Sequence, residues 1–98
     1  MTAARNESLR FSLRQLEIFI AVASTGTTAE AGQVLAMSQS AVSAALKALE
    51  NNHNAELFDR IANRLVLNPT GRKLEVRARV LLEEARQLQA ELLLASPS

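Results

Sequence analysis

The chain has 98 residues and a mass of 10.6 kDa, enough for one domain or for one domain with an extension. It has no cysteine and a single histidine, His53, which excludes disulfides and thiolate zinc sites and argues against a histidine metal site or a Ser–His–Asp triad. Its three aromatic residues include no Trp or Tyr, which argues against a stacking platform for single-stranded nucleic acid.

The formal net charge of +1 conceals an uneven distribution along the chain. Residues 50–59 carry three acidic side chains and no Lys or Arg. Residues 60–79 carry six Lys and Arg against one Glu, a net charge of +5. A concentrated basic stretch is typical of a phosphate-binding surface, but also of a solvated helix face. Charge alone leaves both interpretations open.

Capping patterns divide the first half of the chain into three helices. Residues 1–11 are polar and aperiodic and are expected to form a flexible arm. Ser12 and Gln15 form a capping box before a helix that Gly26 ends. One face of this helix is apolar: Leu13, Leu16, Phe19, Ile20 and Ala23.

The next two helices have the pattern of a helix-turn-helix. Thr27 and Glu30 form a second capping pattern, and a turn at residues 36–38 leads to a helix that Ser38 caps and that fades near Asn54. Ala31 and Gly32 provide the small side chains that a close helix crossing demands. The inner face of the pair is apolar: Leu35, Met37, Val42 and Leu46.

A change of periodicity then predicts a two-stranded ribbon and a long final helix. Residues 60–67 alternate around a turn at Ala62 and Asn63. Asn68 caps, and Pro69 begins, a helix over 69–94 that would be about 39 Å long. Apolar residues recur along it at heptad spacing: Leu74, Ala78, Leu81, Ala85, Leu88 and Leu92. This apolar stripe either covers the small domain or packs on a second copy, and the length of the helix favours the second copy.

The outward face of the third helix can enter a DNA major groove. It carries small, polar or basic residues and no acidic one: Gln39, Ser40, Ser43, Ala44 and Lys47. An inert polar face on a three-helix bundle is the alternative. The ribbon that follows favours a winged helix, with Arg64 near the wing tip and beside the minor groove. Arg60 is expected either to contact DNA or to pair with Glu50 or Glu56.

The ordered motifs of the chain resemble the N-terminal DNA-binding domain of LysR-type transcriptional regulators. The resemblance runs without a gap from about Leu13 to Leu92. Its motifs are Leu13-Arg-Gln-Leu-Glu-Ile-Phe19, Gly26, Ser38-Gln-Ser-Ala-Val-Ser43, Ala48-Leu-Glu50, Leu57-Phe-Asp-Arg60 and Leu67-Asn-Pro-Thr-Gly71. It implies a mainly α fold, a winged helix-turn-helix followed by a linker and dimerisation helix, in a bacterial regulator that reads an interrupted inverted repeat. Three further residues are candidates for DNA contact: Arg14, Gln15 and Ser38.

Four departures from the family pattern are informative. Ala44 stands where a long polar residue is frequent, so one usual DNA contact is missing. Asn54 replaces a glycine after the recognition helix, and Asn is the least costly substitute at positive φ. Asn63 stands where the wing is often basic, which leaves more of the wing contact to Arg64. The chain also has no room for the effector-binding domain, so it is expected to be the DNA-binding fragment of a longer regulator.

These observations predict a double-stranded DNA reader that acts as a homodimer, or as a tetramer when full-length. The expected layout is an arm over 1–11, a winged helix over 12–68, a linker helix over 69–94 and a hinge start or chain end over 95–98. A dimerisation or interaction module and a non-specific DNA-binding protein are the alternatives. We expect a cytoplasmic protein with no enzymatic activity, cofactor, metal site or membrane contact, and a small-molecule effector only through the absent domain.

Overall fold

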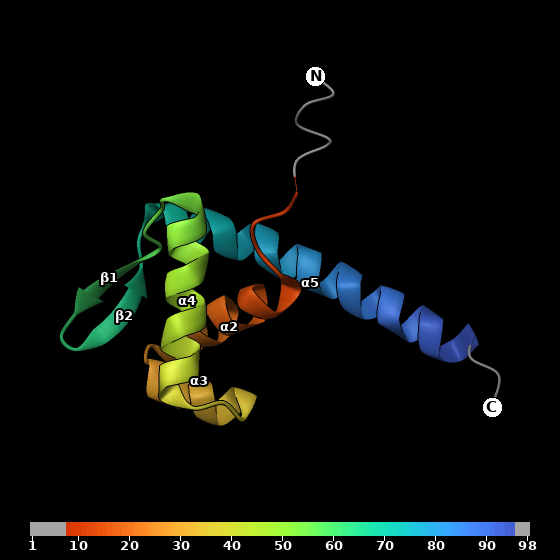
Figure 1. Ribbon diagram of the computed structural model, residues 1–98, viewed down its shortest axis with the longest axis horizontal. Helices are drawn as coiled ribbons and strands as arrows, with labels where there is room; N and C mark the ends of the chain where they lie inside the picture. The colour runs from red at the N-terminus through yellow and green to blue at the C-terminus, as the bar shows by residue number, and fades with distance from the viewer. Residues whose placement is uncertain (1–7, 96–98) are drawn as a thin grey trace, which may run out of the picture.

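The computed structural model describes residues 8–95 as three helices, a β-hairpin and a long final helix (Figure 1). The elements in chain order are α2 (Leu13–Thr25), α3 (Thr28–Leu35), α4 (Gln39–His53), β1 (Phe58–Ile61), β2 (Arg64–Leu67) and α5 (Pro69–Ala95). The two strands are antiparallel, with Phe58 opposite Leu67 and Ile61 opposite Arg64. The predicted mainly α fold, with a winged helix-turn-helix and a long final helix, is confirmed.

The helix boundaries follow from local capping, as the sequence predicts. The Ser12 hydroxyl accepts from the Gln15 backbone N–H at 3.0 Å, and the Gln15 side chain accepts from the Ser12 N–H at 3.0 Å. Thr27 and Ser38 accept from the backbone of the third residue onward in the same way. The Asn68 side chain accepts from the Gly71 N–H at 2.8 Å and so caps α5.

Left-handed backbone ends the helices and closes the hairpin. Gly26 ends α2 with φ of 87°, and Asn54 ends α4 with φ of 52°, the conformation predicted for it. Ala62 and Asn63 both have positive φ, as a tight two-residue hairpin turn requires. Ala36 ends α3 with φ of 57°, a conformation that is costly for a residue with a Cβ.

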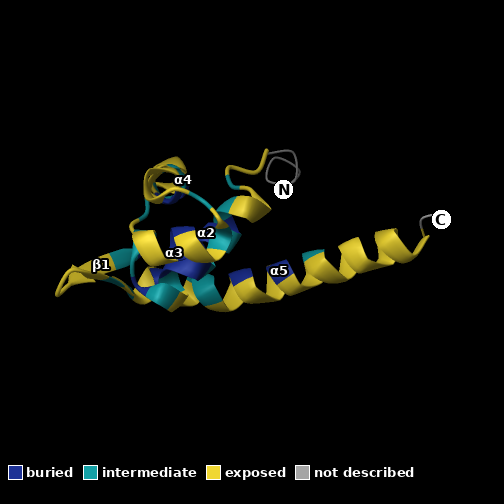
Figure 2. Ribbon diagram, turned by 90° about the horizontal axis from the view of Figure 1, so that it is seen from below, coloured by how far each residue is buried: buried dark blue, intermediate teal, exposed yellow. Residues whose placement is uncertain are grey.

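The core lies around α2, which packs against α3, α4, α5 and β2. Phe19, Val22 and Val42 are fully buried in this core. The Phe19 ring lies 5.5 Å from the Phe58 ring, centroid to centroid, which joins the base of the hairpin to the core. The helices and the base of the hairpin therefore share one hydrophobic cluster. Figure 2 shows the buried part of the ribbon in this region.

The segment before α2 is attached to α4 over its last residues. The Asn52 side chain donates to the Arg10 carbonyl at 3.1 Å, and the Phe11 ring lies 6.1 Å from that of His53. Phe11 is partly buried against the core, so residues 10–11 differ from the predicted flexible arm. Residues 1–7 of the predicted arm fall outside the described residues, as do residues 96–98 of the segment predicted over 95–98. Ala95, the first residue of that segment, is the last residue of α5.

The helices among residues 8–95 include none that is both long and apolar enough to cross a membrane.

We predict that Ala36→Gly stabilises the fold by about 1 kcal/mol, because glycine adopts positive φ without a steric penalty. Urea unfolding monitored by circular dichroism measures the change. Ala44→Gly is the matched control, because Ala44 is exposed within a regular helix, where glycine should cost about 1 kcal/mol instead. A destabilised Ala36→Gly protein would contradict the strain assigned to this turn.

Candidate nucleic-acid interface

The turn between α3 and α4 depends on the absence of a side chain at Gly32. The Met37 N–H donates to the Gly32 carbonyl at 2.8 Å, which folds the turn tightly against α3. A Cβ built at Gly32 would lie 2.5 Å from the Met37 carbonyl oxygen, closer than atoms can pack. Ala31 beside it is fully buried. The small residues that the helix-turn-helix pattern predicted therefore occupy the position where the two helices meet.

The predicted recognition face of α4 is exposed along its length. Each of its five residues is solvent-exposed: Gln39, Ser40, Ser43, Ala44 and Lys47. The opposite face carries Val42, Leu46 and Leu49, which are buried in the core. Figure 2 shows α4 on the far side of the domain from α5, with its outer surface uncovered. The face is free to meet a flat or grooved partner.

The first turn of α4 contains no acidic residue. The Ser38 hydroxyl accepts from the Ala41 N–H at 3.1 Å and lies 3.3 Å from the Ser40 hydroxyl. Ser38 therefore acts as the N-cap of α4. Ser40 beside it is exposed, and its hydroxyl is accessible to solvent. The free N–H groups and the dipole at this end of a helix attract anions such as phosphate.

A groove of about 530 Å³ separates α4 from the hairpin. Lys47 from α4 and Arg60 from β1 both line it, so two elements contribute positive charge to one groove. Glu50 and Glu56 also line it, and the Glu50 carboxylate accepts from the Leu57 N–H at 2.9 Å. Arg60 forms no ion pair with either glutamate. The structural pairing considered for Arg60 is thus not observed.

Sequence reasoning missed three polar residues that line this groove: Thr28, Asn51 and Asn54. Asn51 follows Lys47 by four residues, so helical spacing from the predicted face could have indicated it. Thr28 belongs to α3, and only the tertiary structure places it beside α4.

Arg64 lies at the first position of β2, directly after the hairpin turn, as predicted. Its guanidinium Nη2 donates to the Thr25 carbonyl at 2.5 Å, so the side chain reaches back to the end of α2. The side chains of Arg14 and Gln15 are also engaged within the protein. Arg14 pairs with Glu17 at 3.1 Å, and Gln15 belongs to the capping box of α2.

The structure divides the apolar stripe of α5 into two parts. Ala78 is 1% exposed and Leu74 is partly buried, because the first half of α5 packs against α2 within the same chain. Ala78 is therefore a core residue, which corrects its assignment to a dimer interface alone. Leu82, which the stripe did not include, is also buried. Leu88 and Leu92 remain 58% and 64% exposed on the second half of the helix.

Two adjoining apolar hollows border the stripe. The larger, of about 460 Å³, lies between α4 and α5 and is lined by Phe11, Leu49, His53 and Leu74 among others. The smaller, of about 380 Å³, includes Leu13, Ala85 and Leu88. Leu81 and Glu84 line both, so the two hollows form one continuous apolar surface along α5. Within residues 8–95 no cluster of three His, Asp or Glu side chains could hold a metal ion.

Residues 13–72 match the family model described as "Bacterial regulatory helix-turn-helix protein, lysR family". The chain belongs to the LysR family. The match covers α2 through the first turn of α5 and therefore includes the whole helix-turn-helix and the hairpin. The resemblance that the sequence motifs carried is confirmed.

Relatives and solved structures of similar sequence support the same assignment. An uncharacterized HTH-type transcriptional regulator of Escherichia coli, YeiE, is 49% identical over 81 residues, which are 83% of this chain and 28% of the relative. A mutant of OxyR from Corynebacterium glutamicum superposes with a TM-score of 0.86 at 29% identity, over 94% of this chain and 30% of that one. The CbnR_DBD–DNA complex superposes with a TM-score of 0.79 at 31% identity, over 89% of this chain and 100% of that one. The chain thus spans less than a third of its E. coli relative.

Gly32→Ala should destabilise the domain by about 1–3 kcal/mol, because the added methyl group would force α3 away from the Met37 carbonyl. Thermal unfolding measures the loss. Gln33→Ala, on the exposed side of the same helix, serves as the control and should change stability by less than about 0.5 kcal/mol. Equal stability of the two variants would show that the turn tolerates a wider crossing.

Proposed function

We propose that this chain is the DNA-binding part of a LysR-type transcriptional regulator and reads double-stranded DNA as a homodimer. In this mode α4 enters the major groove, and the hairpin follows the neighbouring minor groove. The observation that carries the proposal is the uncovered outer face of α4, which combines hydrogen-bonding side chains with the absence of acidic ones.

The size and chemistry of this face match a major groove. A helix of 15 residues is about 22 Å long, and the groove is about 12 Å wide. Gln39 offers both an amide donor and a carbonyl acceptor to base edges, and Ser43 follows one turn later on the same face. Ala44 adds only a methyl group, which can contact thymine. Base recognition is therefore assigned to Gln39, Ser40 and Ser43.

Phosphate contacts are assigned to the basic residues beside this face. Lys47 and Arg60 line one groove from its two walls, where a DNA strand would pass between α4 and the hairpin. The first turn of α4 adds backbone N–H groups and the hydroxyl of Ser38. Such contacts supply most of the affinity and fix the register of the protein on the duplex. Arg14 and Gln15 stay predicted contacts, whose side chains would first have to leave Glu17 and Ser12 respectively.

A second copy of the chain is proposed to cover the apolar surface along α5. Leu81, Leu88 and Leu92 are each at least 43% exposed, a costly arrangement for large apolar side chains in one row. A second α5 would bury this row and would set the distance between two α4 helices. A two-fold symmetric protein reads symmetric half-sites, so the operator should be an inverted repeat.

The remaining parts of the regulator lie outside this chain in the proposal. The E. coli relative is more than three times as long as the matched segment, so any effector-binding domain and any tetramer contact would belong to that additional length. The intact protein would act in the bacterial cytoplasm, where its operator is. The CbnR_DBD structure, a DNA complex at 31% identity, supports the same use of the fold.

A non-specific architectural DNA-binding protein is the second candidate. The formal net charge of +1 and the two glutamates in the groove disfavour it, because such binding relies on a strongly positive surface. Selection of bound duplexes from a random pool at about 0.15 M salt separates the two. Enrichment of an interrupted inverted repeat would support the proposal, and retention without enrichment would support the non-specific alternative.

We predict that Gln39→Ala and Ser43→Ala change which bases the protein prefers, because each removes groups that read base edges. Discrimination against a mismatched half-site should fall by about 1–3 kcal/mol for a lost bidentate contact. Lys47→Ala is the matched comparison from the same helix face and should weaken all duplexes alike. Binding titrations on the selected operator and on a scrambled duplex measure both effects. Equal losses on the two duplexes for Gln39→Ala would contradict its assignment.

Leu88→Lys should convert the dimer to a monomer, raising the dimer dissociation constant about 100-fold or more, since an unpaired ammonium is costly to bury. Sedimentation equilibrium measures the constant. Val76→Lys is the control: Val76 is 65% exposed and lies on the opposite side of α5 from the stripe. A Leu88→Lys protein that stays dimeric would exclude the stripe as the interface.

A further inference from the structure

The side chain of Arg64 links the tip of the hairpin to the end of α2. Its Nη2 donates to the carbonyl of Thr25, the last residue of α2, at 2.5 Å. The two residues are 39 positions apart in the sequence, so this contact is tertiary and not a local turn. The guanidinium thus satisfies a carbonyl that the end of a helix leaves without a backbone partner.

Gly26 makes room for this contact. The guanidinium of Arg64 lies over the Cα of Gly26, where any Cβ would collide with Nη2. Gly26 also holds φ at 87°, which turns the chain from α2 into α3. Gly26 therefore has two roles: it adopts the backbone conformation that the turn needs, and it leaves space for the guanidinium of Arg64.

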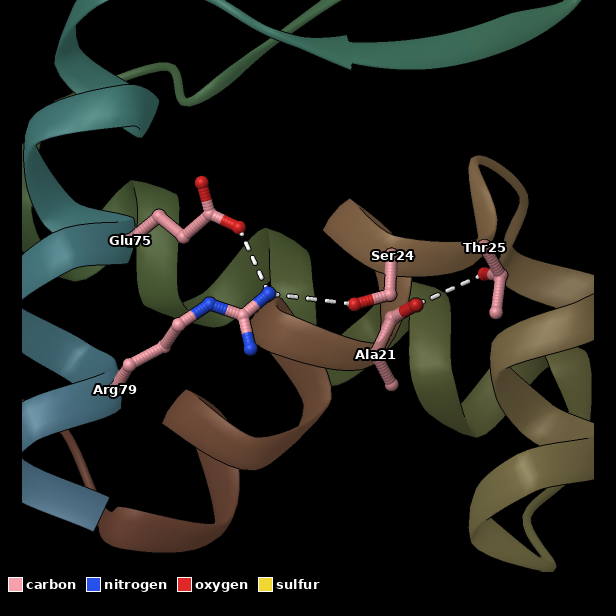
Figure 3. A network of polar contacts seen from close by, with 5 residues as sticks. All are labelled: Ala21, Ser24, Thr25, Glu75 and Arg79. Atoms are coloured by element: carbon pink, nitrogen blue, oxygen red, sulfur yellow. Dashed lines mark hydrogen bonds and ion pairs between the residues drawn. The ribbon is translucent and has the colours of Figure 1, made fainter. Parts of the chain in front are cut away.

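A backbone hydrogen bond next to the Arg64–Thr25 contact also attaches β2 to the end of α2. The Leu65 N–H donates to the Gly26 carbonyl at 2.8 Å, so consecutive residues of β2 bind consecutive residues of the α2–α3 turn. The turn is itself braced, because the Thr25 hydroxyl lies 3.1 Å from the Thr27 carbonyl as well as 2.9 Å from the Ala21 carbonyl. From the other side Arg79 of α5 pairs with Glu75 at 2.9 Å and reaches Ser24 at 3.5 Å, as Figure 3 shows.

This attachment governs where the hairpin stands relative to α4. The second strand packs on α2 and α5, and the groove of about 530 Å³ keeps the hairpin apart from α4. The hairpin has no broad packing on α4 within the described residues, so its angle is fixed through α2 and α5. At the base the Phe19–Phe58 pair holds it, and near the tip Arg64 and Leu65 do.

We propose that Arg64 is a positioning residue, which holds the hairpin at the angle that lets α4 and the hairpin engage adjacent grooves together. The inference rests on the proposed DNA-binding function and adds to it a residue that acts through the hairpin. The minor-groove contact predicted for Arg64 from the sequence is the competing outcome, and it would require the guanidinium to leave Thr25.

The first measurement is hydrogen exchange on the free protein, with no DNA present. Arg64→Ala should speed exchange of the Leu65 amide about five-fold or more, because that N–H depends on the attachment to Gly26. Arg86→Ala removes the same charge from the second half of α5, where Arg86 pairs with Glu83 at 3.9 Å, and should leave the Leu65 amide unchanged. Unchanged exchange in Arg64→Ala would overturn the proposal.

The second measurement is the salt dependence of binding to the selected operator. Arg64→Ala should weaken binding about five-fold while the slope of log K against log salt stays as in the unaltered chain. Lys47→Ala, the phosphate comparison, should lower that slope by about 0.9. A slope lowered by as much in Arg64→Ala, or an unchanged affinity, would overturn the positioning role.

Gly26→Ala keeps the charge of Arg64 and removes the space for its guanidinium, and it also strains the turn at a φ of 87°. It should therefore weaken operator binding at least as much as Arg64→Ala. The double variant should bind about as weakly as Gly26→Ala alone, because both changes break the same contact. Thermal unfolding checks that Gly26→Ala stays folded. Additive losses would overturn the proposal.

The outcomes separate this inference from the proposed function. An unaltered chain that binds no duplex would end both the proposed function and a positioning role in DNA binding, whatever the exchange result. Sequence-selective binding together with unchanged Leu65 exchange would retain the function and overturn the inference alone.

Discussion

The structure depends above all on the burial of α2, because α3, α4, α5 and β2 all pack against this one helix. Phe19 and Val22 are fully buried at its centre, and Phe19 also meets Phe58 at the base of the hairpin. Burial of such side chains contributes about 1.5–3 kcal/mol each. It also decides the direction of α4, since the recognition face points outward when Val42 and Leu46 on the opposite face are buried in the core.

The long helix α5 serves two purposes along its length. Its first half belongs to the domain, where Gly71 lies against the Leu57 carbonyl and Ala78 and Leu82 are buried. Its second half extends away from the domain and is mostly exposed, as Figure 2 shows. Leu88 and Leu92 are among its exposed residues. In the proposed dimer this second half is the contact between copies. Because α5 also packs within each domain, it would set the position of one recognition helix relative to the other.

The charges of the proposed interface are placed for selectivity and not for maximal attraction. Lys47 and Arg60 face the groove together with Glu50 and Glu56, and Lys47 is the one charged residue among the five of the recognition face. A surface of this kind attracts phosphate less strongly than a highly basic one, so the hydrogen bonds to base edges count for more in the choice of duplex. The attachment of the hairpin to the α2–α3 turn adds a geometric requirement, since both parts of the interface must fit at once.

The sequence by itself determined the features that depend on near neighbours in the chain. Capping at Ser12, the left-handed stop at Asn54 and the hairpin turn at Ala62 are decided within about four residues, and the structure has all three. The same holds for the exposed face of α4, which follows from helical periodicity. Only the tertiary structure decided which part of the α5 stripe the domain buries, that Leu82 is buried too, and that Arg64 reaches Thr25. Those contacts join residues far apart in the chain, and their geometry depends on how the packed helices are rotated against one another, which a pattern along one segment does not specify.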